Sequence, residues 1–309
     1  MVPPATFTSY YGRAVLKASP WSEDIPAYLF LGGLAAGSSL LGAGADLTGR
    51  PGMRRNGRLA ALAALTGSFY FLVHDLGKPS RFYNMLRVAK PTSPMSVGTW
   101  ILTAYGPFMG LAGVSELPGL RWLRPLARPA GLAAAAVAPA VASYTAVLLS
   151  DTATPAWHDA HRELPFVFVG SAAAASGGLQ LVLSPLPETG PARRFALAGA
   201  VLELAAEQRM EQSMGLSAEA LHEGVAGRWM RAARALTSAG AGLGLVSRRS
   251  RALSAVAGAA LVAGSVCTRF GVFEAGQQSA RDPRYTVVPQ RERLANGSAL
   301  PAVPARGTR

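Results

Sequence analysis

Apolar and polar segments alternate along the chain with the spacing of membrane-spanning helices. A helix needs about 20 mostly apolar residues to cross a bilayer. Eight segments approach this composition, and polar stretches with Pro and Gly separate them. They are residues 25–45, 59–76, 97–114, 130–149, 165–183, 195–206, 230–246 and 252–273. The pattern predicts an all-α membrane protein with eight transmembrane helices.

The two ends of the chain differ from these segments. Residues 1–24 precede the first segment, and the N-terminal stretch has no apolar core, so we expect no cleavable signal peptide there. Residues 280–309 are polar and lack apolar periodicity, so we expect a disordered tail or a strap on a partner protein. The membrane domain should then extend over residues 25–279.

The basic residues indicate an orientation, because loops rich in Lys and Arg remain in the cytoplasm. One set of short loops is dense in arginine: Arg50, Arg54, Arg55, Arg58, Arg121, Arg124, Arg128, Arg193, Arg194, Arg248, Arg249 and Arg251. With an even number of spans, both termini lie on the opposite side. We therefore expect a multi-pass protein of a bacterial cell membrane with both termini outside the cytoplasm.

The overall composition supports a membrane protein and excludes two other classes. Only 15% of the 309 residues are charged, against about 25% in a soluble domain. The net charge of +13 does not indicate nucleic-acid binding, because the arginines lie between apolar segments and form no stripe. With Cys267 as its one cysteine, the chain can form no internal disulfide and cannot hold an iron–sulfur cluster by itself.

His74 and Asp75 stand at the outer end of the second apolar segment. Ionisable groups at the edge of a membrane bundle are frequently functional. An imidazole oriented by a carboxylate can exchange protons with a bound redox molecule. Alternatively, the pair forms hydrogen bonds with the loop that follows it. That loop carries Lys78, Arg81 and Arg87, which can fix its course or contact an acidic partner.

Other polar residues in the segments also leave two readings open. Tyr144 can hold a carbonyl oxygen of a lipid-soluble ligand or bond a backbone carbonyl of a neighbouring helix. Glu203 and Arg269 can form a buried ion pair or part of a proton path. His158 and His161 have metal-ligand spacing, but no third ligand is evident, and haem b needs histidines on facing helices. We expect neither metal nor haem in this chain.

Three stretches resemble the NrfD family, the polysulfide-reductase-type membrane subunits. They are "PAYLFLGGLAAGSSLLGAGADL" at residues 26–47, "HDLGKPSRFYNMLRVAKPTSPMSVGTWIL" at residues 74–102 and "SYTAVLLSDTATPAWHDAHRELPFVFVGSAAAASGG" at residues 143–178. The resemblance implies eight spans arranged as two four-helix bundles. It also implies a partner subunit with four iron–sulfur clusters, which contacts a molybdopterin catalytic subunit.

The resemblance further implies a quinone or menaquinone as bound substrate, near the iron–sulfur partner. Its matching positions here are Tyr28, His74, Asp75 and Tyr144. The partner is expected to dock on a surface that includes Lys78, Arg81, Arg87, Trp157 and His158. Two alternative functions are a proton-conducting or transport module, and a membrane anchor without quinone chemistry.

Overall fold

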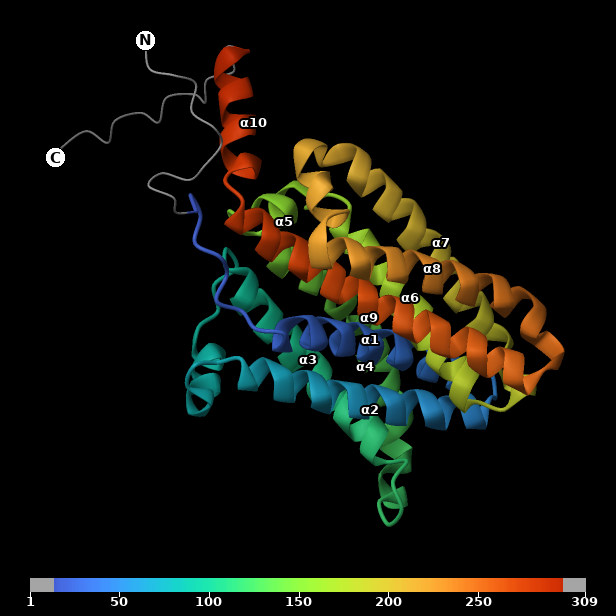
Figure 1. Ribbon diagram of the computed structural model, residues 1–309. Coiled ribbons are helices and arrows are strands. Elements are labelled where there is room, and N and C mark those ends of the chain that lie inside the picture. The colour runs from blue at the N-terminus through green and yellow to red at the C-terminus, as the bar shows by residue number, and fades with distance from the viewer. Residues whose placement is uncertain (1–13, 297–309) are drawn as a thin grey trace, which may run out of the picture.

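The computed structural model describes residues 14–296, and most of these residues are helical, with no strand among them (Figure 1). The long helices are α1 (Asp24–Leu47), α2 (Pro51–His74), α3 (Pro94–Val114), α4 (Arg124–Ser150), α6 (Leu164–Leu183), α7 (Gly190–Ser213), α8 (Gly224–Val246) and α9 (Arg251–Arg281). Shorter helices are α5 (Pro155–Asp159), α10 (Arg284–Ala295), and the 3₁₀ segments η2 (Pro79–Arg87), η3 (Arg121–Leu123), η4 (Leu186–Glu188), η5 (Gly215–Leu221) and η6 (Ser247–Arg249). The prediction of an all-α protein is confirmed.

Each apolar segment of the sequence corresponds to one long helix. Five of the helices are long and apolar enough to cross a membrane, namely α1, α3, α4, α6 and α9. Helix α2 reaches that composition only when it is taken together with η2, which is bent from it by 102°. Helices α7 and α8 do not reach that composition. The described chain thus has five to six candidate spans, and eight spans remain a prediction.

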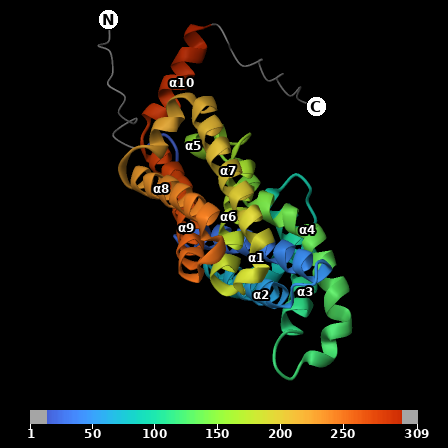
Figure 2. The ribbon, with the colours of Figure 1, turned by 90° about the vertical axis from the view of Figure 1, so that its right-hand side faces the viewer.

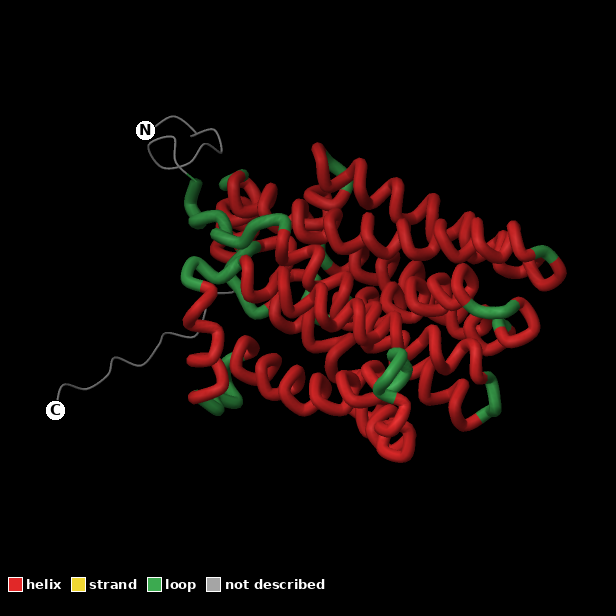
Figure 3. The backbone as a smooth tube through the Cα atoms, turned by 90° about the horizontal axis from the view of Figure 1, so that it is seen from below, coloured by secondary structure: helices red, strands yellow, loops and turns green. Residues whose placement is uncertain are grey.

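The long helices pack in two groups that lie side by side (Figures 1 and 2). In the first group, α1 packs on α2 and α4, and α3 packs on α4. In the second group, α6 packs on α7 and α9, and α8 packs on α9. Helix α6 also packs on α1 and α4 and so joins the groups, which we call the first and second bundles. Most loops gather at the ends of the helices, as Figure 3 shows.

One end of the molecule holds the end of α2, η2, α5 and the end of α9, and we call it the His74 end (Figure 1). The α1–α2 and α8–α9 turns lie at the opposite end. Helix α10 extends beyond the bundles at the His74 end. Residues 284–295 are therefore helical, and the expectation of a disordered tail is wrong for them. Residues 280 and 281 of the expected tail belong to α9, whereas residues 297–309, like residues 1–13, lie outside the described residues.

Acidic residues of the arginine-rich loops hold the α1–α2 turn in place. Arg58 lies between two carboxylates, with Nη1 2.9 Å from Glu116 Oε1 and Nη2 2.9 Å from Asp46 Oδ2. The same Nη2 donates to the backbone carbonyl of Ala127. Glu188 accepts hydrogen bonds from the backbone of Gly52 and Met53 at the start of α2, where a carboxylate also compensates the helix dipole. These contacts connect α1, α2, α4 and the loops after α3 and α6.

Candidate functional site

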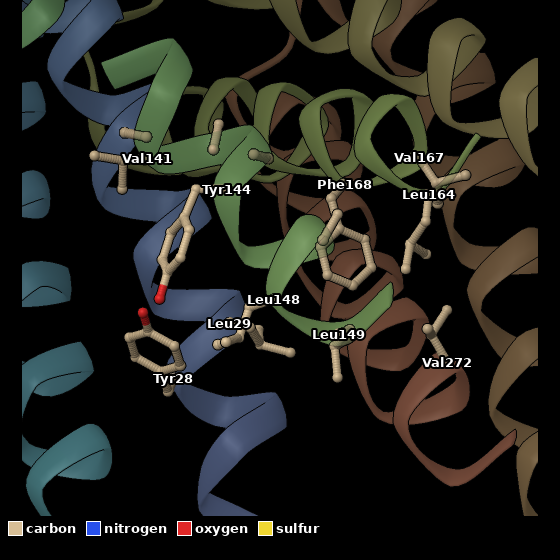
Figure 4. Packing of buried hydrophobic residues seen from close by; sticks show 14 of the residues in the cluster. Tyr28, Leu29, Val141, Tyr144, Leu148, Leu149, Leu164, Val167, Phe168 and Val272 are labelled. Carbon is tan, nitrogen blue, oxygen red and sulfur yellow. The ribbon is translucent and has the colours of Figure 1, made fainter. Parts of the chain in front are cut away.

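Two tyrosines of the first bundle face each other inside the molecule. Tyr28 on α1 and Tyr144 on α4 are both buried, and their hydroxyl groups point toward one another (Figure 4). Apart from the facing Tyr144 hydroxyl, the Tyr28 hydroxyl has no hydrogen-bond partner among the described residues. A buried tyrosine hydroxyl normally has such a partner. The pair can therefore still donate to an oxygen atom of a ligand.

The position of Tyr144 depends on a glycine in α3. A Cβ atom on Gly98 would lie 1.8 Å from Cζ of Tyr144 and 2.0 Å from its hydroxyl oxygen. The tyrosine ring therefore rests directly against the backbone of α3. Leu29, Val141 and Leu148 surround the pair (Figure 4). The sequence analysis identified both tyrosines but gave no reason to single out Gly98.

His74 and Asp75 lie at the end of α2 in this bundle, but they do not pair with each other. His74 Nδ1 lies 2.6 Å from Asp24 Oδ2, and the imidazole stacks on Tyr70. Asp75 accepts hydrogen bonds from the Ser22 backbone and from its hydroxyl, at 3.1 and 2.7 Å. The carboxylate that orients the His74 ring is thus Asp24, fifty residues earlier in the chain.

The segment before α1 is also attached to the second bundle. The side-chain amide of Gln277 on α9 donates to the backbone carbonyls of Ser19 and Trp21, at 3.2 and 3.3 Å. The Trp21 ring lies 5.8 Å from the ring of Trp157. Residues 19–24 therefore contact both bundles at the His74 end.

An apolar pocket of about 520 Å³ lies between α2, η2 and α3. Leu65 and Leu102 line it, and both belong to the core cluster that contains the two tyrosines. Val73, next to His74, and Phe82 of η2 line the pocket toward the His74 end. Three threonines also line it, but each donates its hydroxyl to a backbone carbonyl of its own helix. None of the four predicted quinone contacts lines the pocket itself, which shares only the core cluster with the tyrosine pair and offers apolar volume.

The residues predicted to dock a partner do not all lie at the surface. Lys78, Arg81 and Arg87 are exposed on or next to η2, beside the exposed rings of Phe82 and Tyr83. No residue of η2 is buried. The exposed basic and aromatic side chains therefore form one surface at the His74 end, which we call the η2 surface.

Trp157 does not lie on the surface, as the predicted docking role would require. His158 is exposed and meets that requirement. The Trp157 side chain is 1% exposed, and its indole N–H donates to the Val272 carbonyl at 2.8 Å. It packs against Gly276, where a Cβ atom would lie 1.9 Å from Trp157 Cε2. Its side chain joins α5 to α9 and does not reach a partner. The ring of His158 stacks on His161 at the surface.

Glu203 and Arg269 are buried in the second bundle. Glu203 Oε1 accepts a hydrogen bond from Thr268 at 2.7 Å. Arg269 donates to the carbonyl of Phe168 at 2.9 Å, and its guanidinium lies 3.7 Å from the centre of the Phe168 ring. Within residues 14–296, no three His, Cys, Asp or Glu side chains gather as a metal site. The structure thus separates the tyrosine pair in the first bundle from this polar pair in the second.

Five helices that are long and apolar enough to cross a bilayer define a multi-pass membrane protein. A family model for polysulphide reductase, NrfD, matches residues 15–186. This range covers more than half of the 309 residues and includes α1 to α6, so the chain belongs to the NrfD family. A comparison with curated proteins found no match. NrfD proteins are membrane subunits of oxidoreductase complexes, which associate with catalytic subunits.

Proposed function

We propose that this subunit binds quinone or quinol between α1 and α4 and exchanges electrons with an iron–sulfur partner at its His74 end. The observation that carries the proposal is the buried Tyr28–Tyr144 pair, in which the Tyr28 hydroxyl faces the Tyr144 hydroxyl and has no other hydrogen-bond partner among the described residues. A quinone presents carbonyl oxygens that accept hydrogen bonds from phenolic hydroxyls. The apolar pocket of about 520 Å³ between α2, η2 and α3 suits an apolar quinone tail.

Quinone chemistry moves protons as well as electrons. A quinone takes up two electrons and two protons to become a quinol, and quinol oxidation releases them again. The His74 side chain is 60% exposed and hydrogen-bonded to Asp24, so it can exchange protons between solution and the outer end of the first bundle. Tyr28 and Tyr144 position the oxygen atoms of the ring.

The electrons must come from, or go to, a partner subunit, because we expect no metal centre in this chain. We propose a subunit with four iron–sulfur clusters, docked on the η2 surface and connected to a molybdopterin catalytic subunit. Lys78, Arg81 and Arg87 give this surface a positive charge for an acidic partner. Exposed Phe82 and Tyr83 supply apolar contact area.

Replacing Tyr144 by phenylalanine is expected to weaken quinone-analogue binding by roughly three- to tenfold, because one hydrogen bond contributes about 0.5–1.5 kcal/mol. Binding is measured on the purified chain in detergent, and quinone-linked turnover is measured on the assembled complex. Assembly should be unchanged. An absorption spectrum of the same sample tests for haem.

Tyr105→Phe is the matched control for this substitution. Tyr105 is also a buried tyrosine of the first bundle, but its hydroxyl already donates to the Ala35 carbonyl at 2.9 Å. The control should lower stability without changing binding. Wild-type binding and turnover in Tyr144→Phe would remove Tyr144 from the site, and a Soret band would replace the proposal with a haem protein.

Replacing Arg81 by alanine is expected to weaken association with the iron–sulfur subunit by up to about fivefold, the effect of one exposed ion pair. The measurement is the amount of that subunit that co-purifies at increasing salt, since salt screens exposed charges. Arg249→Ala, an exposed arginine at the opposite end, is the control. Equal co-purification of both variants would argue against docking on the η2 surface.

A further inference from the structure

The centre of the second bundle contains a group of polar side chains contributed by all four of its helices. Glu203 comes from α7, Thr237 from α8, Ser171 from α6, and Thr268 and Arg269 from α9. Each of them is at most 1% exposed. The Glu203 carboxylate accepts a hydrogen bond from Thr268 at 2.7 Å, and the charge of Arg269 acts on it. The position lies well inside the bundle, away from both of its ends.

Several polar atoms of this group have no protein partner. Among the described residues, the second carboxylate oxygen of Glu203, the hydroxyl of Thr237, and Nε and Nη1 of Arg269 make no hydrogen bond. The hydrogen bond that Arg269 does make goes to the Phe168 carbonyl. Buried polar atoms without partners cost free energy. Glu203 is therefore held near a cation but retains an oxygen atom that can take up a proton.

A series of ionisable side chains connects this group to the surface at the His74 end. Glu203, Glu207 and Glu211 follow at intervals of four residues on one face of α7. Arg234 of α8 contacts Glu207 at 2.7 Å and also Glu211. Glu211 lies 3.5 Å from Nε2 of His222, whose side chain is 48% exposed. The series thus begins in the core and ends at an imidazole in contact with solvent.

We propose that Glu203 is a proton-binding site that exchanges its proton with the aqueous surface at His222 by way of Glu207 and Glu211. The proton enters on a ring nitrogen of His222 and passes to the carboxylates of Glu211, Glu207 and Glu203 in turn. Each group returns to its former state when it gives the proton on. Arg234 keeps its own protons and holds Glu207 and Glu211 in position.

Access to this site is from one side. In the other direction along α7, Gly199 and Ala196 pack directly against Ala174 and Gly177 of α6. The charged groups that face Glu203 are Arg269 from α9 and Glu207 from its own helix; Arg234 of α8 acts through Glu207. The site is thus a proton store open to the His74 end, and it does not depend on quinone binding in the first bundle.

The test uses infrared difference spectra of the purified full chain in lipid discs, recorded over a range of pH in H₂O and D₂O. We expect a carbonyl band of a protonated carboxylic acid that disappears as the pH rises and shifts in D₂O. The band should be lost in Glu203→Gln and should move in Glu203→Asp. Glu292→Gln, an exposed glutamate on α10, should leave it unchanged.

The route is tested by the rate at which this band shifts after transfer into D₂O. His222→Ala and Glu211→Gln should slow the shift, whereas His161→Ala, at an exposed histidine outside the series, should not. The proposed proton binding by Glu203 would be wrong if the wild-type chain showed no such band at any pH. It would also be wrong if the band persisted in Glu203→Gln. The proposed route would be wrong if the band shifted at the wild-type rate in both His222→Ala and Glu211→Gln. If Glu203→Gln does not fold, the comparison of wild type with Glu203→Asp decides.

Discussion

Replacing Arg58 by alanine is expected to lower the free energy of unfolding by about 3–5 kcal/mol, the effect of removing one partner from a buried ion pair. The guanidinium neutralises Glu116 and Asp46, whose side chains are 3% and 12% exposed. Without it, both carboxylates remain in an interior that does not solvate them. The carbonyl of Ala127 loses a donor as well. The place where α1, α2 and α4 meet then contains two unneutralised carboxylates, which destabilise the folded state.

The measurement is a denaturant titration in detergent, and Arg54→Ala is the matched control. Arg54 approaches the same two carboxylates, at 3.4 and 3.6 Å, but its side chain is 31% exposed. Its removal should cost at most about 1 kcal/mol. An equal loss in the two variants would show that burial of Arg58 does not determine the stability of this cluster.

Replacing Gly98 by alanine is expected to abolish quinone-analogue binding and to lower stability by about 1–3 kcal/mol, the usual cost of overpacking. The new methyl group would occupy the position of the Tyr144 ring, 1.8 Å from Cζ. The backbones of α3 and α4 cannot separate without opening the core, so the ring must leave its place. Its hydroxyl then no longer faces Tyr28.

Gly110→Ala is the control, because a Cβ atom at Gly110 meets no other atom within 4 Å. In the interior of the same helix, this change should be neutral or stabilising by about 0.5–1 kcal/mol. Binding and unfolding are measured on both variants. Full binding in Gly98→Ala would show that the orientation of Tyr144 is not required by the ligand.

The periodicity of apolar residues was sufficient to find the long helices but not to place their ends. The second apolar segment starts at residue 59, because the arginines before it look like part of a loop. The structure begins α2 at Pro51 and buries Arg58 inside the bundle. Its partners Asp46 and Glu116 come from other elements, and no local pattern indicates that they converge.

The candidate site shows the same limit. Tyr28 and Tyr144 were predicted from the family resemblance, but the partner of His74 was not, because Asp24 lies fifty residues away. Trp157 was expected on the docking surface, but its side chain is buried. It is buried because Gly276, on the last long helix, leaves room for its ring. Contacts between segments far apart in the sequence determine both the partner of His74 and the burial of Trp157.

The attachment of residues 19–24 has a consequence for the biosynthesis of the chain. Gln277, which binds the carbonyl of Trp21, follows it by 256 positions. Chains begin to fold at the N-terminus while the ribosome is still adding residues. The contacts of Ser22 and Asp24 with α2 can form early, but the contact with Gln277 must wait until α9 has been translated and inserted. Residues 19–24 are therefore among the last parts of the fold to be completed, and a nascent chain that stops after α8 lacks their hydrogen bonds to α9.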